Sequence, residues 1–313
     1  MAVAPGEYMP TARSTTSSAF RIGRHDVPVT NLPKVLYPEA GFTKGEVLSY
    51  YQAIAPVMLP HLKGRPVTLK RYPNGVDQPF FYEKACPSHR PKWVKVAEVE
   101  TTNRTIPFCV VDSAATLVWV ANLAALELHT LLSKAPRLER PTMMVFDHDP
   151  GPGVSVIDCA RVAIEFREML GKLGLESFVK TSGGKGLHLY VPLNTAVTFD
   201  QTKTFSRAIA QLLEKRDPAR VTTNMRKDLR GGRVFVDWSQ NDTHKTTACA
   251  YTLRARGRPT VSTPVTWAEV ERAVKKKDEG MLTFEAGAVM KRVQKVGDLF
   301  EEVLAVKQKL PGL

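Results

Sequence analysis

The sequence MMVFDHDPGPG, residues 143–153, limits the possible fold more than any other stretch of the chain. Its first four residues are continuously apolar and too few for a helix, so they predict a buried β-strand. Asp147 and Asp149 follow, and a turn rich in proline and glycine then ends the strand. Because side chains alternate along a strand, these two aspartates share one face. Phe146 and His148 lie on the other face.

Two neighbouring carboxylates repel each other unless a cation lies between them. Oxygen ligands of this kind suit hard divalent ions such as magnesium or manganese. A third acid, Asp237, ends a second apolar strand in GGRVFVDWSQN, residues 231–241. Three carboxylates at strand ends are typical of two-metal phosphoryl transfer. A single aspartate at a strand end, taken alone, is more simply a turn residue.

A glycine-rich segment, KTSGGKGLHLYVPL at residues 180–193, lies between these acids in the sequence. It is not a Walker A loop, because that pattern needs Ser or Thr after the lysine and here Gly186 follows Lys185. Its glycines still allow backbone N–H groups to approach a phosphate, and Lys185 adds a positive charge. Ser182 and His188 flank the glycines. A plain hairpin turn with a surface lysine is the alternative interpretation.

The composition is that of a globular protein with a basic surface. The chain has 313 residues, of which 43% are hydrophobic, and this suffices for one large domain or two ordinary ones. Its net charge of +13 favours a polyanionic partner such as nucleic acid or an anionic membrane surface; a merely basic protein is the alternative. The longest apolar stretch, residues 116–128, is too short to span a membrane, and the N-terminus lacks the apolar core of a signal peptide. The four cysteines form no CxxC pair and are expected to be reduced thiols of a cytoplasmic protein: Cys86, Cys109, Cys159 and Cys249.

Local patterns predict a mixture of helices and strands. Residues 1–19 are rich in Ser, Thr, Ala and Pro, lack periodicity and are expected to form a disordered tail. A capping box at Thr43 and Glu46 opens a helix that ends near Met58, and the apolar residues 112–130 predict a second helix. Further strands are predicted at 65–73, 79–84, 177–182, 187–193 and 231–239 and within 89–111, and further helices from 155, over 200–216 and after 267. The mixture indicates an α/β or α+β domain with a mixed or antiparallel sheet.

FDHDPGPG, TSGGKGLHLYVPL and RVFVDWSQN occur in the order and spacing of the three signature motifs of archaeo-eukaryotic primase-type polymerases. The chain resembles in particular the polymerase domain of bacterial ligase D, also in TNLPKVLYP, GRPVTLKRYPNGVDQPFFYEK and LRARGRP. The resemblance covers roughly residues 28–305 and extends to stand-alone actinobacterial homologues of the Primase-Polymerase C type. It implies an α+β primase fold for residues 20–313, with an RRM-like palm built on a mixed or antiparallel sheet and a second small β/α layer.

The resemblance also implies roles for individual residues. The catalytic residues, which would bind two divalent metal ions (manganese or magnesium), are Asp147, Asp149 and Asp237. The nucleotide-binding residues would be Lys70, His129, Ser182, Lys185, His188, Arg254 and Arg256. Recognition of a 5′-phosphate on DNA falls on Lys34 and Lys44, and template binding on Phe81, Tyr82 and Arg230. His148 stands where the family usually has leucine, and no metal role is expected for it.

The implied function is template-dependent addition of nucleotides, preferably ribonucleotides, to 3′-hydroxyl ends at short 5′-phosphorylated gaps or breaks in DNA repair. The expected partners are gapped or broken duplex DNA, NTPs and dNTPs, and end-joining or repair proteins. A cytoplasmic, nucleoid-associated monomer without a membrane contact is expected. The alternative is a non-catalytic scaffold that binds DNA gaps or ends in end joining. Three converging acids inside a basic groove favour the enzyme, because a scaffold does not need them.

Overall fold

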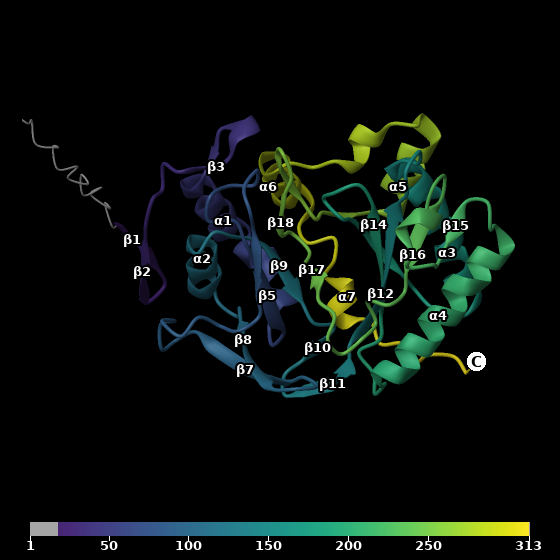
Figure 1. Ribbon diagram of the computed structural model, residues 1–313, viewed down its shortest axis with the longest axis horizontal. Helices are drawn as coiled ribbons and strands as arrows, with labels where there is room; N and C mark the ends of the chain where they lie inside the picture. The colour runs from purple at the N-terminus through teal and green to yellow at the C-terminus, as the bar shows by residue number, and fades with distance from the viewer. Residues whose placement is uncertain (1–17, 313) are drawn as a thin grey trace, which may run out of the picture.

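Two six-stranded sheets form the body of the computed structural model, which describes residues 18–312 (Figure 1). Helices cover their outer sides, and the segment that carries β17 and β18 runs between them (Figure 1). The predicted tail at residues 1–19 lies outside the described residues except for Ser18 and Ala19, which belong to strand β1 (Ser18–Ile22). Among residues 18–312, no helix combines the length and the apolar character needed to cross a bilayer.

The first sheet, called the palm sheet below, is mixed, as predicted. Its strand order is β15-β16-β12-β14-β13-β20. The central strand β12 (Met143–Pro150) is antiparallel to both β14 and β16, whereas β15 and β16 are parallel. The other strands are β13 (Phe178–Thr181), β14 (Leu187–Pro192), β15 (Val221–Thr222), β16 (Val234–Asp237) and β20 (Pro264–Val265).

The second sheet has the order β17-β9-β5-β8-β7, with β6 paired to β5. Its members are β5 (Pro66–Arg71), β6 (Phe81–Glu83), β7 (Lys95–Glu100), β8 (Thr105–Val110), β9 (Ala125–Thr130) and β17 (Thr247–Ala248). The expected α+β primase architecture is therefore present. The second layer has as many strands as the palm sheet, although the resemblance implied a small one.

Shorter elements complete the fold. The two-stranded pairs are β1 with β2 (His25–Val29), β3 (Val35–Tyr37) with β4 (Phe42–Thr43), β10 (Ser133–Lys134) with β11 (Arg137–Pro141), and β18 (Leu253–Ala255) with β19 (Pro259–Val261). The C-terminal helices are α5 (Trp267–Lys276), α6 (Ala286–Val296) and α7 (Glu302–Ala305). The Asn194 side chain, which follows β14, donates to the Val303 carbonyl in α7 at 3.2 Å and ties this C-terminal helix to the palm sheet.

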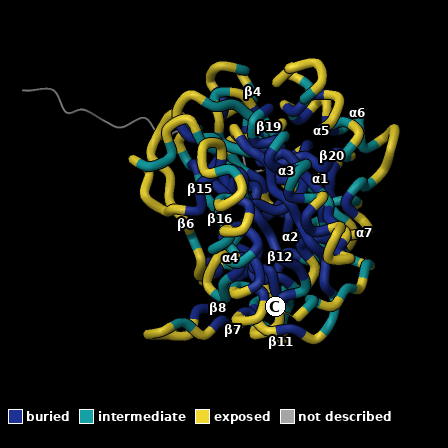
Figure 2. The backbone as a smooth tube through the Cα atoms, turned by 90° about the vertical axis from the view of Figure 1, so that its right-hand side faces the viewer, coloured by how far each residue is buried: buried dark blue, intermediate teal, exposed yellow. Residues whose placement is uncertain are grey.

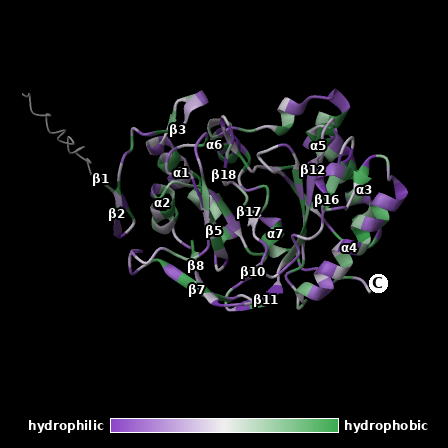
Figure 3. Cartoon of the chain, in the orientation of Figure 1, coloured by the Kyte–Doolittle hydropathy of each residue, from purple (hydrophilic) through white to green (hydrophobic). Residues whose placement is uncertain are grey.

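The buried residues, drawn in dark blue in Figure 2, form one large apolar cluster around the second sheet and its helices, which also includes Met143, Val145 and Tyr190 of the palm sheet. Further apolar clusters lie between the palm sheet and its helices. Helices α3 (Val156–Lys172) and α4 (Phe199–Arg216) cover one face of the palm sheet, where the rings of Phe146 and Phe166 lie 4.4 Å apart. The apolar and polar residues of α4 lie on different sides of the helix, as the periodicity predicts (Figure 3). Since helices cover this face, the opposite face of the palm sheet is the one that faces the second sheet (Figure 1).

Helix α1 (Lys44–Leu62) begins with the predicted capping box. The Thr43 hydroxyl accepts a hydrogen bond from the Glu46 N–H at 3.2 Å, and the Glu46 carboxylate accepts one from the Thr43 N–H at 2.7 Å. These two bonds satisfy donors that a helix start otherwise leaves unpaired. The helix continues past Met58 to Leu62.

The predicted helix at residues 112–130 is wrong in its second half. Helix α2 (Ala114–Asn122) ends early, and Ala124 adopts a left-handed backbone conformation with φ of 58°. The chain then enters strand β9. Periodicity did not show this break, because almost every residue in the stretch is apolar and both elements are buried.

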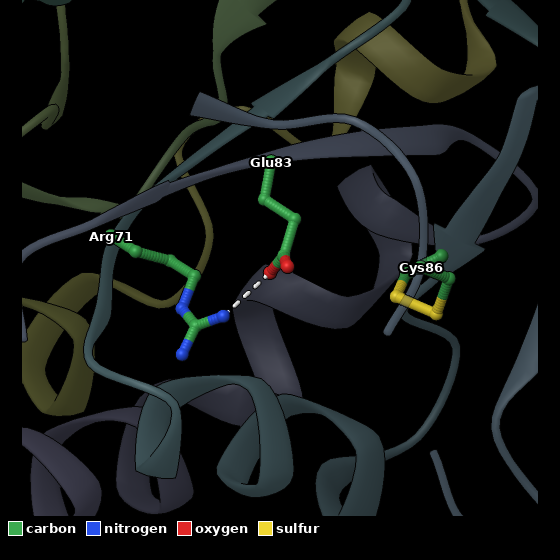
Figure 4. Close-up of a disulfide and its surroundings, with 4 residues drawn as sticks. Arg71, Glu83 and Cys86 are labelled. Carbon is green, nitrogen blue, oxygen red and sulfur yellow. Dashed lines mark hydrogen bonds and ion pairs between the residues drawn. A yellow bond between two sulfur atoms is a disulfide. The ribbon is translucent and has the colours of Figure 1, made fainter. Parts of the chain in front are cut away.

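The expectation of reduced thiols is also wrong for two of the four cysteines. Cys86 and Cys109 form a disulfide, shown in Figure 4, while Cys159 and Cys249 are free and buried. The segment after β6 runs beside β8, where the Cys86 N–H donates to the Pro107 carbonyl at 2.6 Å. The two cysteines are 23 residues apart in the sequence, and this spacing does not predict the disulfide, because strand pairing brings them together.

Candidate active site

Strand β12 places Asp147 in one row with residues of its two neighbours. Asp147 lies opposite His188 on β14 and opposite Asp237 on β16. Residues in register on antiparallel strands project from the same face. The Nε2 atom of His188 lies 3.3 Å from Asp147 Oδ1. The sheet register thus brings together acids and a histidine from all three sequence motifs.

His148 lies on the opposite face, as strand alternation predicts. It is fully buried, with its ring 5.7 Å from the ring of Phe166 in α3. Neither ring nitrogen has a side-chain hydrogen-bond partner among the described residues. Burial lowers the pKa of His148 to about 4, so the ring is neutral. It packs against the helical layer and not against the acids.

The electrostatics of the acids indicate that a positive charge belongs between them. Burial, and next the charge of Asp237, raise the pKa of Asp147 to about 7. The charge of Asp147, and next burial, raise the pKa of Asp149 to about 7 as well. Two carboxylates that raise each other's pKa are stable together only with a shared proton or a cation. Asp147 Oδ1 is buried and accepts no hydrogen bond in the described part of the chain, because His188 Nε2, 3.3 Å away, does not lie in hydrogen-bonding geometry.

The glycine-rich segment forms a tight turn between β13 and β14. The Ser182 hydroxyl accepts hydrogen bonds from the N–H groups of Gly184 and Gly186, both at 3.1 Å. At Gly183, where φ is +68°, a Cβ would lie 2.6 Å from the carbonyl carbon of Val261. Ser182 therefore closes the turn, and Lys185 is exposed at its tip. Two of the amides that the sequence suggested for phosphate binding are already paired.

The facing side of the second sheet carries the other predicted nucleotide-binding groups. On β5, Thr68 lies opposite His129 of β9, and Lys70 lies opposite Glu127. All four side chains share one face, because they are in register at every second position. Burial lowers the pKa of Lys70 and the pKa of His129, and the negative charge of Glu127 partly offsets both decreases.

Glu127 is the centre of this face, and the sequence interpretation missed it. Its carboxylate is almost fully buried, with 3% of the side chain exposed. Oε1 accepts from Lys70 Nζ (3.4 Å), the Tyr72 hydroxyl (3.3 Å) and the Ala255 N–H (3.1 Å), and Oε2 lies 2.9 Å from His129 Nε2 and 3.1 Å from Arg254 Nε. Burial alone would raise the pKa of Glu127, but His129, Arg254 and Lys70 hold this pKa well below its usual range. Its position two residues before His129 could have indicated a role for Glu127, but only if the segment is known to be a strand, where residues two apart share a face.

Arg254 joins the two sheets. Its guanidinium lies beside Glu127 and also donates to the Ser182 carbonyl at 2.6 Å. Arg256 lies against the same turn, since a Cβ on Gly184 would be 2.6 Å from its guanidinium nitrogen. Both predicted arginines therefore contact the motif that holds Ser182 and His188.

A cavity of about 420 Å³ lies between the sheets. Asp147 and His188 line it from the palm sheet, His129 and Thr68 line it from the second sheet, and Arg254 lies between them. Thr68 is 1% exposed, and its hydroxyl has no hydrogen-bond partner among residues 18–312. The cavity therefore offers polar atoms that the folded chain leaves without partners. Thr68 and the lining segment 240–248 were not identified from the sequence.

The predicted template-binding residues lie near the cavity but do not form one surface. Tyr82 pairs with Lys70 and faces the cavity, with its ring 6.3 Å from that of His129. Phe81 is one residue earlier on β6 and stacks on Arg71 on the other face, at 5.0 Å. Both aromatic side chains are exposed. The Arg230 guanidinium lies 3.5 Å from the centre of the Phe235 ring, beside the palm acids.

The two lysines predicted to bind a 5′-phosphate are neighbours. The Lys44 N–H donates to the Lys34 carbonyl at 2.7 Å. Lys34 is exposed and its ammonium donates to Asn74 Oδ1 at 3.0 Å, whereas Lys44 is buried and donates to the Thr30 hydroxyl at 3.3 Å. Burial, and next the charge of Lys34, lower the pKa of Lys44 to about 8. A lysine pair whose charges oppose each other favours an anion between them.

Comparison with known proteins agrees with this geometry. Residues 43–300 match the family model described as "LigD, primase-polymerase domain". The chain belongs to the LigD primase-polymerase domain family. Members of this family are nucleotidyltransferases of the primase-polymerase type, so the chain is an enzyme of that class.

The relatives are longer multifunctional proteins. The non-homologous end joining DNA repair protein LigD of Mycobacterium tuberculosis is 43% identical over 289 residues, which are 88% of this chain and 37% of that protein. LigD of Bacillus subtilis is 31% identical over 255 residues, or 79% of this chain and 41% of that protein. The LigD primase-polymerase chain described here thus spans less than half the length of these curated relatives. The solved polymerase domain of Mycobacterium tuberculosis ligase D in complex with DNA has a TM-score of 0.83 and 43% identity, over 90% of this chain and 98% of that one.

Membership of the LigD polymerase family implies the use of divalent metal ions, and the palm acids fit such ions in part. Asp147 has an oxygen that accepts no hydrogen bond, and the carboxylates of Asp147 and Asp149 repel each other. Asp237 accepts from Ser239 N (2.8 Å), Ser239 Oγ (2.6 Å) and Gln240 Nε2 (2.8 Å), which leaves one of about four acceptor positions of its carboxylate. Among residues 18–312, no three or more His, Cys, Asp or Glu side chains are grouped so that they could hold a metal ion. The donor chemistry fits a hard cation, with Asp147 and Asp149 as open ligands and one position left on Asp237.

Proposed function

We propose that this chain is a template-dependent polymerase that adds nucleotides, preferably ribonucleotides, to 3′-hydroxyl ends at short 5′-phosphorylated gaps or breaks in DNA. The observation that carries the proposal is the cavity between the sheets, which has Asp147 and His188 on one side and His129 and Arg254 on the other. A cavity lined by a carboxylate and an arginine suits a nucleoside triphosphate held by metal ions. The DNA in the solved Mycobacterium tuberculosis structure and the net charge of +13 support a DNA partner.

In this proposal, two divalent ions, manganese or magnesium, bind to Asp147, Asp149 and Asp237. When bound, they lower the pKa of the attacking 3′-hydroxyl and stabilise the leaving pyrophosphate. The chain's own cations, Lys70, Lys185, Arg254 and Arg256, hold the triphosphate, and the neutral rings of His129 and His188 and the Ser182 turn shape its pocket. Tyr82 and Phe81 stack on template bases, and Arg230 positions the template beside the acids.

The preferred DNA and the biological setting are further parts of the proposal. Lys34 and Lys44 bind the 5′-phosphate of the downstream strand, so that short gaps are preferred over open primer-templates. The curated relatives act in non-homologous end joining, and we propose the same repair setting for this chain, with repair proteins as partners. It acts as a monomer in the cytoplasm, on the DNA of the nucleoid. A non-catalytic scaffold is not favoured, because it would not need a buried carboxylate oxygen without a partner.

The proposal predicts that Asp147→Ala abolishes primer extension but not DNA binding. Extension is measured on a 5′-phosphorylated gap with manganese and ribonucleotides, and binding by fluorescence anisotropy on the same DNA. We expect extension to fall to background, since a ligand of the ions is lost, while affinity for DNA stays equal or rises because a repelling carboxylate is gone.

His148→Leu is the matched control, because it lies one residue away on the opposite face of β12. We expect it to retain extension. Substantial extension by Asp147→Ala would contradict the assignment of the acids, and wild-type protein that binds the gap but never extends it would support the scaffold instead.

A further inference from the structure

A lysine that the sequence motifs did not single out lies behind His188. Lys180 on β13 is fully buried and lies opposite His188 in the strand register. Its Nζ is 3.0 Å from His188 Nδ1 and 2.5 Å from the Ser262 hydroxyl. In the described part of the chain it forms no ion pair with a carboxylate. A buried ammonium without a counter-charge is costly, so an apolar residue would suit this position better if packing were its only role.

The hydrogen bonds around Lys180 have a direction that one backbone group fixes. The Thr181 carbonyl can only accept, and the Ser262 hydroxyl donates to it at 3.0 Å. The oxygen of Ser262 is then an acceptor for Lys180 Nζ. Burial lowers the pKa of Lys180 to about 7. Below that pH the side chain is an ammonium with three donors and no acceptor, so Lys180 also donates to Nδ1 of His188.

This direction decides which nitrogen of His188 carries the proton. If Nδ1 accepts from Lys180, the proton of the neutral ring is on Nε2. Nε2 lies 3.3 Å from Asp147 Oδ1 and lines the cavity between the sheets. With the opposite tautomer, the lone pair of Nε2 would face a carboxylate and any incoming phosphate, and both contacts would be repulsive.

We propose that Lys180 and Ser262 are positioning residues that hold His188 with its proton on Nε2, so that the Nε2–H group faces the cavity and donates to the phosphate of the nucleotide. The inference rests on the proposed polymerase function for the phosphate, but the tautomer follows from the protein alone. Partners behind a functional histidine that fix its tautomer typically change activity about 10- to 100-fold when removed. Neither Lys180 nor Ser262 lines the cavity, and Lys180 contacts its lining through His188.

The test is the tautomer of His188, measured at about pH 6, where Lys180 is protonated, by nuclear magnetic resonance on the full chain labelled with ¹⁵N in its seven histidines. A His188→Gln variant assigns the signals of this ring. We expect wild-type His188 to be neutral with its proton on Nε2. In Lys180→Met, which keeps the length of the side chain but removes the donor, we expect both tautomers. His148 is the internal control, since it is buried on the other face and its signals should not change between the variants.

Ser262→Ala is the second variant, in case Lys180→Met does not fold. It removes the acceptor that orients the ammonium, and we expect a smaller but detectable share of the other tautomer. Primer extension by both variants should fall by about 10- to 100-fold, with DNA affinity unchanged. A wild-type proton on Nδ1, or a tautomer that is the same in wild type and both variants, would overturn the inference. If the tautomer shifts as expected but even wild type does not extend primers, the polymerase proposal fails and the positioning by Lys180 stands.

Discussion

Glu127→Gln is the substitution for which the structure makes the strongest prediction. The change keeps size and shape but removes the negative charge that Lys70 and Arg254 share. The side chains of these two residues are only 14% and 15% exposed, so water cannot replace the lost carboxylate. The N–H donors of the new amide would also face other donors in either orientation. They would face Lys70, Tyr72 and the Ala255 N–H if the nitrogen replaces Oε1, and Arg254 and His129 if it replaces Oε2.

The expected loss of stability depends on the charges that remain buried after the substitution. Removing one member of a buried ion pair typically costs about 3–5 kcal/mol, because the partner charge is left uncompensated. We therefore expect Glu127→Gln to lower the free energy of unfolding by about 3–5 kcal/mol. This is a large share of the roughly 5–15 kcal/mol that stabilises an ordinary domain.

The assay is urea unfolding without nucleotide, followed by tryptophan fluorescence and by far-ultraviolet circular dichroism. The two transitions must coincide for the free energy to be defined. Nucleotide is left out because a bound triphosphate would supply negative charge to the same cations and hide the loss. The matched control is Glu83→Gln, which breaks the 2.9 Å ion pair with Arg71 shown in Figure 4. These side chains are 18% and 22% exposed and only one cation is involved, so the loss should be smaller.

The pH dependence of stability gives a second measure of the contribution of the Glu127 charge. The pKa of folded Glu127 lies well below its usual range, so its contribution is complete above the unfolded pKa of about 4.3 and is lost as the pH falls toward the folded pKa. The stability difference between wild type and Glu127→Gln should therefore be constant from about pH 5 to 7 and shrink below about pH 4. A loss of less than about 1 kcal/mol at pH 7, or a loss equal to that of Glu83→Gln, would refute the role of Glu127 as a buried centre of charge.

Three further predictions concern substrates. Lys34→Ala combined with Lys44→Ala should remove most of the preference for a 5′-phosphorylated gap over a hydroxyl-ended one, roughly ten- to a thousandfold in affinity, while binding to an open primer-template changes little; a uniform drop on all DNA in fluorescence anisotropy at one salt concentration would contradict it. Thr68→Val should leave the urea midpoint almost unchanged, since its hydroxyl has no partner in the fold, but should weaken nucleotide binding by about 0.5–1.5 kcal/mol in equilibrium titration; unchanged affinity would exclude this hydroxyl from the site. Wild-type protein should incorporate ribonucleotides faster than deoxyribonucleotides in single-nucleotide extension, and equal efficiencies would count against a pocket that binds the 2′-hydroxyl.

The sequence alone determined the features that depend on neighbours along the chain. Strand alternation placed Asp147 and Asp149 apart from His148, and the capping box located the start of α1 at Thr43. The motif spacing indicated the family, which the comparisons confirmed. These features follow from periods of two and 3.6 residues and from hydrogen bonds between residues three apart, so a short window of sequence contains them.

The tertiary structure alone decided which distant side chains meet. The register of β5 with β9, and the contact of β18 with β9, make Glu127 a common partner of Lys70 and Arg254, although 127 residues separate Glu127 from Arg254 along the chain. The same kind of pairing creates the Cys86–Cys109 disulfide and buries Lys180 behind His188. Buried polar groups must find partners, but the chain offers many donors and acceptors for each one. Only the closed fold selects among them, because burial and register are properties of the whole molecule and not of any local segment.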